Sequence, residues 1–473
     1  MPEVFLGVLV FVVGMASLGA EIAGVRLLSP YFGASTVVWA NTIGIVLVAL
    51  SLGYWLGGRA ADRRPRLQPL CAVALAAAAL LALVPFVAHP LLDVGVKALD
   101  AVSAGAFVGS LLAVLVLIAL PVLLLGMVTP WALRLAVVKV EEAGTTAGRL
   151  YALSTAGSLV GTLLAALALI PAIGTRRTFL VFAVLLALVA VVGLTKRKEA
   201  LAMPLVIGAL LALPTGTLKG AGDGRVIYET ETEYQYARVI ETAGGERHLE
   251  LNEGHAVHSL YRPGTVLTGD YWDAMYDETF AGSAPVTHVA ILGNAAGTNA
   301  RAFTRLNPEI QLDPVEIDPE LTAIGRRWFG LPRSVRVHHE DARPFLRRRA
   351  GSHWDAILVD AYRQPYIPFY LVTKEFFQLV RDRLTPDGVV VVNVGHPKGN
   401  DKLERAMTAT MRVVFQDVRR DPAMPTNTIL VGGRNLSGPG LQPALGGGSV
   451  YTDDRAPVEW LIDRSLVEYA ADR

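Results

Sequence analysis

The stretch Val289-Ala290-Ile291-Leu292-Gly293-Asn294-Ala295-Ala296-Gly297-Thr298 is a short apolar run that passes directly into a loop of small residues. A buried strand, a loop of small residues and then a helix predict a ligand site, because small residues let the backbone pass close beneath a ligand at a helix N-terminus. This loop alone does not identify the ligand. The strands that follow it in the chain carry more information.

Predicted strands and helices alternate after this loop. The predicted strands are at residues 287–293, 311–316, 334–338, 354–360 and 388–394, and the predicted helices begin near residues 298, 319, 343 and 373. Such alternation predicts a doubly wound, mostly parallel sheet of Rossmann-like, methyltransferase-type fold, with ligands bound outside the carboxyl ends of the strands.

Acids follow three of these strand ends, with the chemistry of a nucleoside pocket. Glu316 comes roughly twenty residues after the glycine loop, a position from which a carboxylate holds ribose hydroxyls. Asp341 could accept from an adenine amino group while Ala342 leaves room for the ring, and Asp360 closes the fourth strand. Any one acid could instead cap a helix. The consecutive strand ends, the glycine loop included, together favour a ligand site.

The same residues resemble the spermidine synthase family, the polyamine aminopropyltransferases, in a membrane-fused form. The resemblance covers about residues 228–463, and its motifs are Tyr234-Gln235, Val315-Glu316-Ile317-Asp318, Asp341-Ala342, Trp354 to Asp360, and Lys374-Glu375-Phe376-Phe377 leading to Leu384 to Gly388. It implies transfer of an aminopropyl group from decarboxylated S-adenosylmethionine to an amine, with release of methylthioadenosine. The nucleoside is a co-substrate, and no prosthetic group is implied.

The resemblance also implies roles for individual residues. Gln235 and Glu316 would hold the nucleoside, and Asp341 and Ala342 would receive adenine, while the small-residue loop itself predicts that Gly293 lies beneath the ligand. Asp360 would be the catalytic proton acceptor. The chemistry agrees, because an amine must be neutral to attack the carbon beside a sulfonium and a carboxylate can orient it and take its proton.

The chain departs from the family pattern on the amine side of the pocket. Ala296 and Arg363 stand where the family has acids, and Tyr271-Trp272-Asp273 replaces a Tyr-His-Glu stretch. The remaining candidates for amine binding are Asp270, Tyr271, Asp273 and Tyr362, with Glu253 as a further acid. The sequence therefore leaves the identity of the amine open.

Two other functions use the same features. A methyltransferase would keep the Glu316 and Asp341 contacts and bind intact S-adenosylmethionine, whose carboxylate could pair with Arg363. A transporter or sensor could carry the nucleoside-binding domain as a regulatory part. We expect no metal, because the adjacent His338 and His339 would point to opposite faces of a strand.

The N-terminal half is a membrane domain by composition. The chain is 52% hydrophobic, with a mean hydropathy of +0.42, which is too apolar for a purely soluble protein. Apolar runs lie near residues 4–25, 37–58, 68–89, 104–128, 151–171 and 178–195, and a bilayer needs about 20 apolar residues per helix. A seventh run, 200–218, contains Pro204 and Pro214.

We therefore expect three domains: a multi-pass bundle of six or seven helices at 1–219, a small β-rich subdomain at 220–285 and a Rossmann-like catalytic domain at 286–473. The subdomain contains predicted strands at residues 225–230, 234–242 and 247–252. A net charge of +1 argues against nucleic acid as a partner, so the expected partners are small molecules and the lipid bilayer.

The bundle resembles half of a major facilitator superfamily transporter. Residues 57–64 are similar to that superfamily's loop between spans two and three, and residues 148–171 to its fifth span. Gly157 and Gly161 would allow close helix packing or line a transport path. A half-size bundle of this kind would be completed by forming a homodimer.

Basic residues predict the orientation of the bundle. Arg63 and Arg64 follow span two, Arg134 and Arg149 lie between spans four and five, and Lys196, Arg197 and Lys198 follow span six. These loops and the N-terminus should be cytoplasmic, although Arg176 and Arg177 fall on the outer side. With six spans the catalytic domain is cytoplasmic, beside its expected donor. A seventh crossing by residues 200–218 would place it outside.

Overall fold

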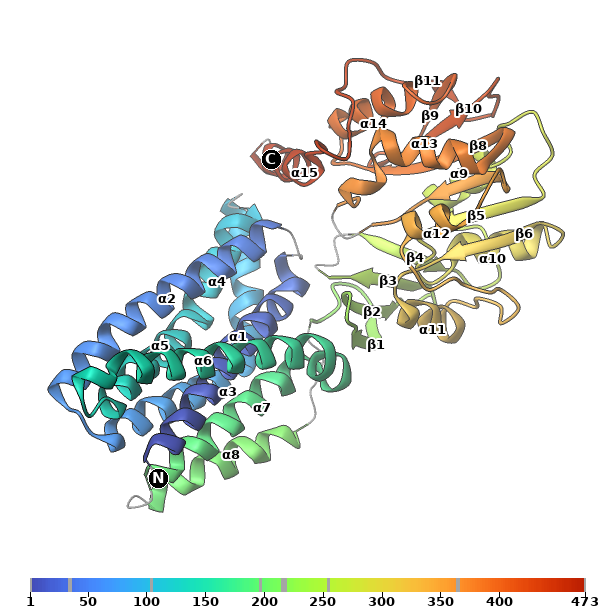
Figure 1. Ribbon diagram of the computed structural model, residues 1–473. Helices are drawn as coiled ribbons and strands as arrows, with labels where there is room; N and C mark the ends of the chain where they lie inside the picture. Colours follow the sequence, from blue (N-terminus) through green and yellow to red (C-terminus); the bar gives the residue numbers. More distant parts are fainter. Residues whose placement is uncertain are drawn as a thin grey trace. The chain divides into compact units, whose positions relative to one another are not determined.

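The chain forms two compact units in a computed structural model (Figure 1). The structure describes residues 2–32, 36–102, 105–194, 198–213, 219–252, 256–362 and 366–471. The first unit comprises Met1–Gly220 and Thr230–Tyr236, and the second comprises Ala221–Glu229 and Ala237–Arg473.

The first unit is a bundle of apolar helices. They are α1 (Pro2–Phe32), α2 (Thr36–Arg63), α3 (Leu67–Val102), α4 (Gly105–Leu117), α5 (Ala119–Ala136), α6 (Ala143–Leu164), α7 (Ile170–Val192) and α8 (Ala202–Leu211). Among the described residues, five stretches are long and apolar enough to cross a membrane: Glu3–Phe32, Val38–Arg63, Leu67–Leu92, Ala119–Ala136 and Val140–Val192.

The fifth of these stretches contains the predicted span 151–171 and most of the predicted span 178–195, whose last residue lies outside the described residues. No loop separates them, because α6 continues through a π-helical turn, Ala165–Leu169, into α7. The chain changes direction at Gly174, whose φ of 80° only glycine adopts freely. The predicted fourth span is also longer than expected, since Ile118 N donates to Val114 O and so joins α4 to α5.

Small residues set the spacing of the bundle helices. A Cβ atom added at Gly157 or Gly161 would collide with the α1 backbone at Phe11 or Met15. An added Cβ at Gly57 of α2 would lie 2.5 Å from the Met127 Cα of α5. In the described structure, Gly157 and Gly161 therefore serve close helix packing, the first of the two roles that the sequence left open.

Most of a small sheet in the order β1-β2-β3-β4 belongs to the second unit, while its segment Thr230–Tyr236 belongs to the first. Its strands are β1 (Arg225–Glu231), β2 (Tyr236–Glu241), β3 (Arg247–Leu251) and β4 (Val257–Tyr261). Strands β2, β3 and β4 pair antiparallel. Three of these strands match the predicted β-rich segments, and β4 was not predicted.

The larger sheet of this unit has the order β11-β9-β10-β8-β7-β5-β6 within the described residues. Its strands are β5 (His288–Leu292), β6 (Gln311–Val315), β7 (Trp354–Val359), β8 (Leu384–Gly395), β9 (Asp417–Met424), β10 (Asn427–Gly433) and β11 (Gln442–Pro443). Strands β6, β5, β7 and β8 are parallel, and β10 pairs antiparallel with β8 and with β9. The predicted α/β fold is confirmed, with an antiparallel end.

Helices connect and flank these strands. They are α9 (Tyr271–Glu278), α10 (Thr298–Leu306), α11 (Pro319–Trp328), α12 (Ala342–Arg348), α13 (Lys374–Arg383), α14 (Lys402–Arg412) and α15 (Val458–Ala471). Strands β5 and β7 are buried almost throughout and β8 is buried from Gly388 to Val394, as expected for parallel strands covered on both faces. Helices α10 to α13 begin within one residue of, or at, the predicted positions.

The predicted strand at 334–338 is wrong. It is reduced to one isolated bridge between Val315 and His338, in which His338 N donates to Pro314 O and Glu316 N donates to His338 O. The preceding pair of residues in this parallel ladder would need a hydrogen bond donated by the backbone N of residue 314. Residue 314 is a proline and has no N–H, so the pairing with β6 cannot extend in that direction. The His338 side chain contacts Asp313, while that of His339 contacts Thr322.

Candidate active site

The candidate site lies where the strand order reverses. Strands β5 and β7 are neighbours, and the connection after β5 leads to β6 on one side while the connection after β7 leads to β8 on the other, which opens a crevice between their carboxyl ends. Asp360 N donates to Leu292 O at 2.8 Å, which joins the end of β7 to the end of β5. Gly293 follows immediately with a φ of 90°.

Gly293 permits this close approach. A Cβ atom at this position would lie 2.6 Å from Ala361 Cα and closer still to Asp360 O. The residue was predicted to lie beneath a ligand. In the structure it lets residues 360 and 361 close over the end of β5, which fixes the position of the Asp360 side chain.

Each oxygen of the Asp360 carboxylate accepts a hydrogen bond from a side chain. Asn393 Nδ2 donates to Oδ1 at 2.8 Å, and the Tyr271 hydroxyl donates to Oδ2 at 3.3 Å. Burial raises the pKa of Asp360 to about 6, although hydrogen bonds from Asn393, Tyr271 and Trp272 act to lower it. A carboxylate with a pKa this close to neutrality suits general-base chemistry.

Asn393 was missed by the sequence analysis. It lies in β8, beside the strand that precedes Asp360, and Asn427 Nδ2 of β10 donates to its Oδ1 at 3.0 Å. Because the Asn393 carbonyl is engaged by Asn427, its amide nitrogen is directed to Asp360. One signal was present in the sequence: Asn393 is the single polar side chain in the apolar run predicted as the strand at 388–394, which follows the strand of the predicted base.

Tyr271 and Tyr362 line the site differently. Tyr271 is buried at the start of α9 and stacks on Trp272 with 4.2 Å between ring centroids. Burial first, and then the Asp360 charge, keep the pKa of Tyr271 well above its usual value, so it stays a hydrogen-bond donor. The Tyr362 hydroxyl donates to Asn393 O and accepts from Gly395 N at 2.6 Å, so it also fastens the end of β8.

Glu316 ties the glycine loop to the next helix. Its carboxylate accepts from Ala295 N at 2.7 Å and from Asp318 N at 3.0 Å, and the residue is 6% exposed. Burial raises the pKa of Glu316 to about 7, and these backbone hydrogen bonds act to lower it. Glu316, which was predicted to hold ribose, thus lies at the glycine loop beside the strand switch point.

Asp341 has the capping role that the sequence analysis kept as an alternative. It accepts from Arg343 N at 2.8 Å as the N-cap of α12. The Tyr370 hydroxyl donates to its other oxygen at 2.6 Å. Ala342 is buried at the first turn of this helix. An adenine amino group would have to replace or share the Tyr370 contact, so the adenine role of Asp341 and Ala342 stays a prediction.

The predicted amine ligands on the α9 side hold their own loop. Asp273 accepts from Thr268 N at 2.8 Å, from the Thr268 hydroxyl and from Gly269 N. Asp270 is the N-cap of α9. These contacts do not favour Asp273 as an amine ligand, because each of its oxygens already satisfies backbone donors. Ala296 is fully buried and its N donates to the Ser259 hydroxyl.

Three predicted residues are not placed with the others. Gln235 belongs to the first compact unit, where its backbone N donates to the Thr232 hydroxyl, and its nucleoside role stays a prediction. Arg363 and Glu253 lie outside the described residues. Among the described residues no group of three or more His, Cys, Asp or Glu side chains could hold a metal ion.

Residues 276–433 match the family model of the spermine/spermidine synthase domain. A probable polyamine aminopropyl transferase of Bifidobacterium longum is 34% identical over 40% of this chain and 42% of its own length. A polyamine aminopropyltransferase of Vibrio vulnificus is 37% identical over 27% of this chain and 43% of its own length. The matched segments thus span less than half of either relative.

One solved structure that resembles the chain is a probable spermidine synthase from Corynebacterium glutamicum. It has a TM-score of 0.39 and 23% sequence identity, over 45% of this chain and 81% of that one.

Gly293→Ala should be the more damaging of two matched substitutions. Gly351 also has a positive φ, of 74°, but open space where a Cβ would lie, so Gly351→Ala should cost only about 1–2 kcal/mol of backbone strain. Gly293→Ala adds the collision with residues 360 and 361. We expect a clearly larger fall in Tm, measured on the full chain in detergent. Equal destabilisation would show that the β5–β7 approach is not tight.

Proposed function

We propose that this chain is a membrane-embedded polyamine aminopropyltransferase. It would transfer an aminopropyl group from decarboxylated S-adenosylmethionine to an amine and release methylthioadenosine. The observation that carries the proposal is the Asp360 carboxylate, which is held by Asn393 and Tyr271 at the strand switch point inside the segment that matches the synthase domain.

The chemistry follows from the position and pKa of Asp360. The amine nitrogen attacks the carbon beside the sulfonium, a C–N bond forms, and the C–S bond breaks with its electron pair on sulfur. The product sulfur is a neutral thioether, and the proton of the attacking amine passes to Asp360. Tyr271 and Asn393 hold the carboxylate in one orientation, which keeps an oxygen lone pair available for the proton.

The donor nucleoside would lie along the carboxyl ends of β5 and β6. Glu316 is anchored there by the glycine loop, and a carboxylate in this position can accept from ribose hydroxyls. No prosthetic group is needed, because the sulfonium itself supplies the leaving group. The family acids replaced by Ala296 and Arg363 leave the amine unassigned, so the acceptor is proposed only as a class, a primary amine or polyamine.

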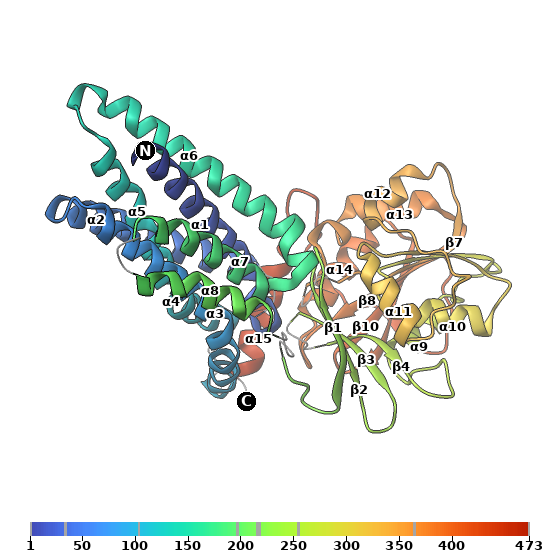
Figure 2. The same cartoon turned by 90° about the horizontal axis from the view of Figure 1, so that it is seen from below.

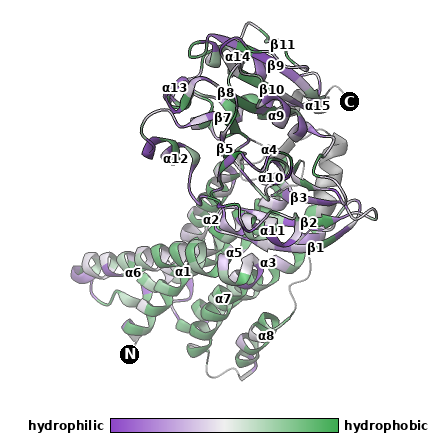
Figure 3. Cartoon of the chain, turned by 90° about the vertical axis from the view of Figure 1, so that its right-hand side faces the viewer, coloured by the Kyte–Doolittle hydropathy of each residue, from purple (hydrophilic) through white to green (hydrophobic). Residues whose placement is uncertain are grey.

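The helices of the first unit support membrane embedding. Large apolar side chains point outward from several of them, including Leu47, Leu52, Val116, Leu159 and Leu167. Figure 3 shows these helices coloured mainly as hydrophobic. Exposed apolar surface on helices of spanning length is typical of contact with lipid. The chain is therefore proposed to be a multi-pass membrane protein. Transport by the bundle and its completion as a homodimer remain predictions.

Asp360→Asn tests the proposed base. The variant keeps the side-chain size but removes the proton acceptor, so methylthioadenosine release should fall about 10²-fold or more. The assay mixes purified protein in detergent with decarboxylated S-adenosylmethionine and a panel of diamines and polyamines. Asp382→Asn, at an exposed position, is the control. Full activity of Asp360→Asn would refute the mechanism. S-adenosylhomocysteine formed from intact S-adenosylmethionine would instead identify a methyltransferase.

Asn393→Ala should shift the pH dependence of the reaction. Its hydrogen bond lowers the pKa of Asp360, so its loss should raise that pKa above about 6. The base is active only when it is ionised. The pH at which kcat/KM reaches half of its plateau should therefore be higher in the variant than in the parent protein. The readout is the acid limb of kcat/KM between pH 5 and 8. An unchanged limb with a merely lower plateau would show that Asn393 does not control Asp360.

Glu316→Ala should weaken nucleoside binding. A hydrogen bond to a charged group contributes roughly 1.5–3 kcal/mol, so its loss should raise the Kd of methylthioadenosine about tenfold or more. Isothermal titration calorimetry measures this directly, with the exposed Glu309→Ala as control. An unchanged Kd would remove Glu316 from the site.

A further inference from the structure

We propose that the segment after α7 crosses the membrane a seventh time, so that the catalytic unit lies outside the cytoplasm. The inference rests on the membrane embedding proposed above and not on the transferase activity. It depends on contacts inside the first compact unit, which define two opposite ends of the bundle.

The first end carries the basic loops. Arg134 of α5 pairs with Asp62 of α2, and Arg149 of α6 pairs with Glu3 of α1. The C-terminal end of α7 lies here too, because a Cβ at Gly193 would meet the Cys71 side chain at the start of α3. By the distribution of arginine and lysine, this end faces the cytoplasm.

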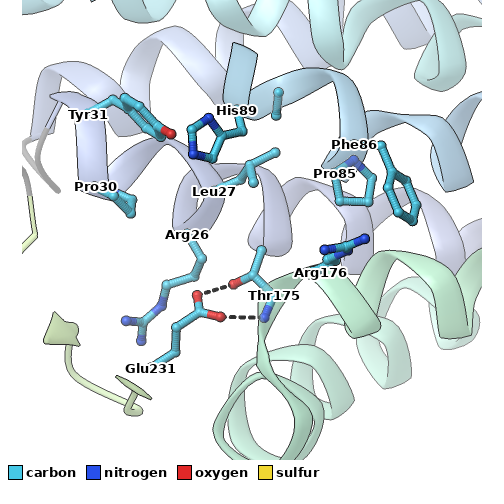
Figure 4. A pocket seen from close by; sticks show the side chains of 11 residues that line it. Arg26, Leu27, Pro30, Tyr31, Pro85, Phe86, His89, Thr175, Arg176 and Glu231 are labelled. Carbon is cyan, nitrogen blue, oxygen red and sulfur yellow. Dashed lines mark hydrogen bonds between the residues drawn. The ribbon is translucent and has the colours of Figure 1, made fainter. Parts of the chain in front are cut away.

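The second end contains the opposite termini of the same helices. Arg26 and Tyr31 of α1, His89 of α3 and Arg176 of α7 line a cavity of about 140 Å³ there, together with Glu231 (Figure 4). Residues 26 and 31 are near the end of α1, and residue 176 follows the kink at Gly174. This end is therefore separated from the basic loops by the length of the helices.

The chain that leads to the catalytic unit is attached to the second end. Lys219 Nζ donates to Pro30 O at 2.9 Å. The Glu231 carboxylate accepts from Thr175 N at 2.6 Å and from the Thr175 hydroxyl, as Figure 4 shows. Arg26 donates to Glu233 O. Residues 219 and 230–236 belong to the same compact unit as the bundle.

The connection between the two ends is long enough to cross. Helix α8 has 10 residues, about 15 Å, and packs against α7 and α3 (Figure 2). The stretch from residue 198 to residue 219 has 22 residues, and about 20 are needed for one crossing of the ~30 Å hydrocarbon core. Ile207 faces the bundle, while Leu205 is 74% exposed.

A return of this segment to the first end is inconsistent with these contacts. Lys219 would then be separated from Pro30 by about the thickness of the bilayer, ~30 Å. The sequence alone favoured six spans and a cytoplasmic catalytic domain, because the donor is expected there. The contacts of Lys219 and Glu231 instead favour the seven-span alternative. The cationic donor and the amine must then reach the outer side of the membrane, so the reaction requires a preceding translocation step.

Cysteine labelling tests this topology. Gly446→Cys places a thiol at an exposed position of the catalytic unit, in a Cys71→Ala background. Arg64→Cys, also exposed, marks the basic end of the bundle. We expect a membrane-impermeant maleimide to label Gly446→Cys in right-side-out spheroplasts and to label Arg64→Cys only after lysis. Labelling of both variants after lysis verifies that each thiol is reactive in the folded protein, and Ser449→Cys gives a second position on the catalytic unit.

Two outcomes would overturn the proposal. Equal accessibility of Gly446→Cys and Arg64→Cys before lysis would exclude the seventh crossing. Protection of Gly446→Cys with labelling of Arg64→Cys would reverse the assigned sides. Because the readout does not involve turnover, either failure is distinguishable from failure of the transferase proposal, which the assays in detergent address separately.

Discussion

The hydrogen bond from Asp360 N to Leu292 O holds the carboxyl ends of β7 and β5 together at the point where the strand order reverses. The bond is possible because Gly293 carries no Cβ, so that residues 360 and 361 can close over the end of β5. The Asp360 side chain, its partner Asn393 in β8 and its partner Tyr271 in α9 all meet at this junction. A displaced β7 end would separate all three.

Burial and hydrogen bonding act in opposite directions on the two carboxyl groups of the site. Desolvation disfavours the charged form of Asp360 and of Glu316, while donated hydrogen bonds favour it. Burial prevails in both cases, and the pKa values rise to about 6 and about 7. The Asp360 carboxylate accepts hydrogen bonds from the side chains of Asn393 and Tyr271, whereas the Glu316 carboxylate accepts from backbone N–H groups of nearby loops. The first arrangement suits proton transfer, and the second suits a fixed ligand contact.

In the unit of apolar helices, small residues and a kink decide how the helices pack and where the chain turns. Gly157 and Gly161 allow α6 to lie directly on α1, and Gly174 turns the chain near the N-terminal end of α7. Thr175 follows this turn, and its backbone N–H donates to the Glu231 carboxylate. The kink at Gly174 thus fixes the place at which the segment around Glu231 is attached to the bundle.

Sequence alone determined the α/β fold, the apolar helices and the strand ends where Glu316 and Asp360 lie, because hydrophobic periodicity and strand ends are local properties of the chain. It failed at 334–338, where Pro314 on a neighbouring strand lacks the N–H that a further rung requires. It also could not find Asn427, which orients Asn393 from a strand far along the chain. Only the tertiary structure decided which acids satisfy donors of their own loops, as Asp273 does, and which are held by side chains of other elements, as Asp360 is. The physical reason is that each carboxylate has few lone pairs, and the donors that take them come from whichever elements the fold brings within hydrogen-bond distance.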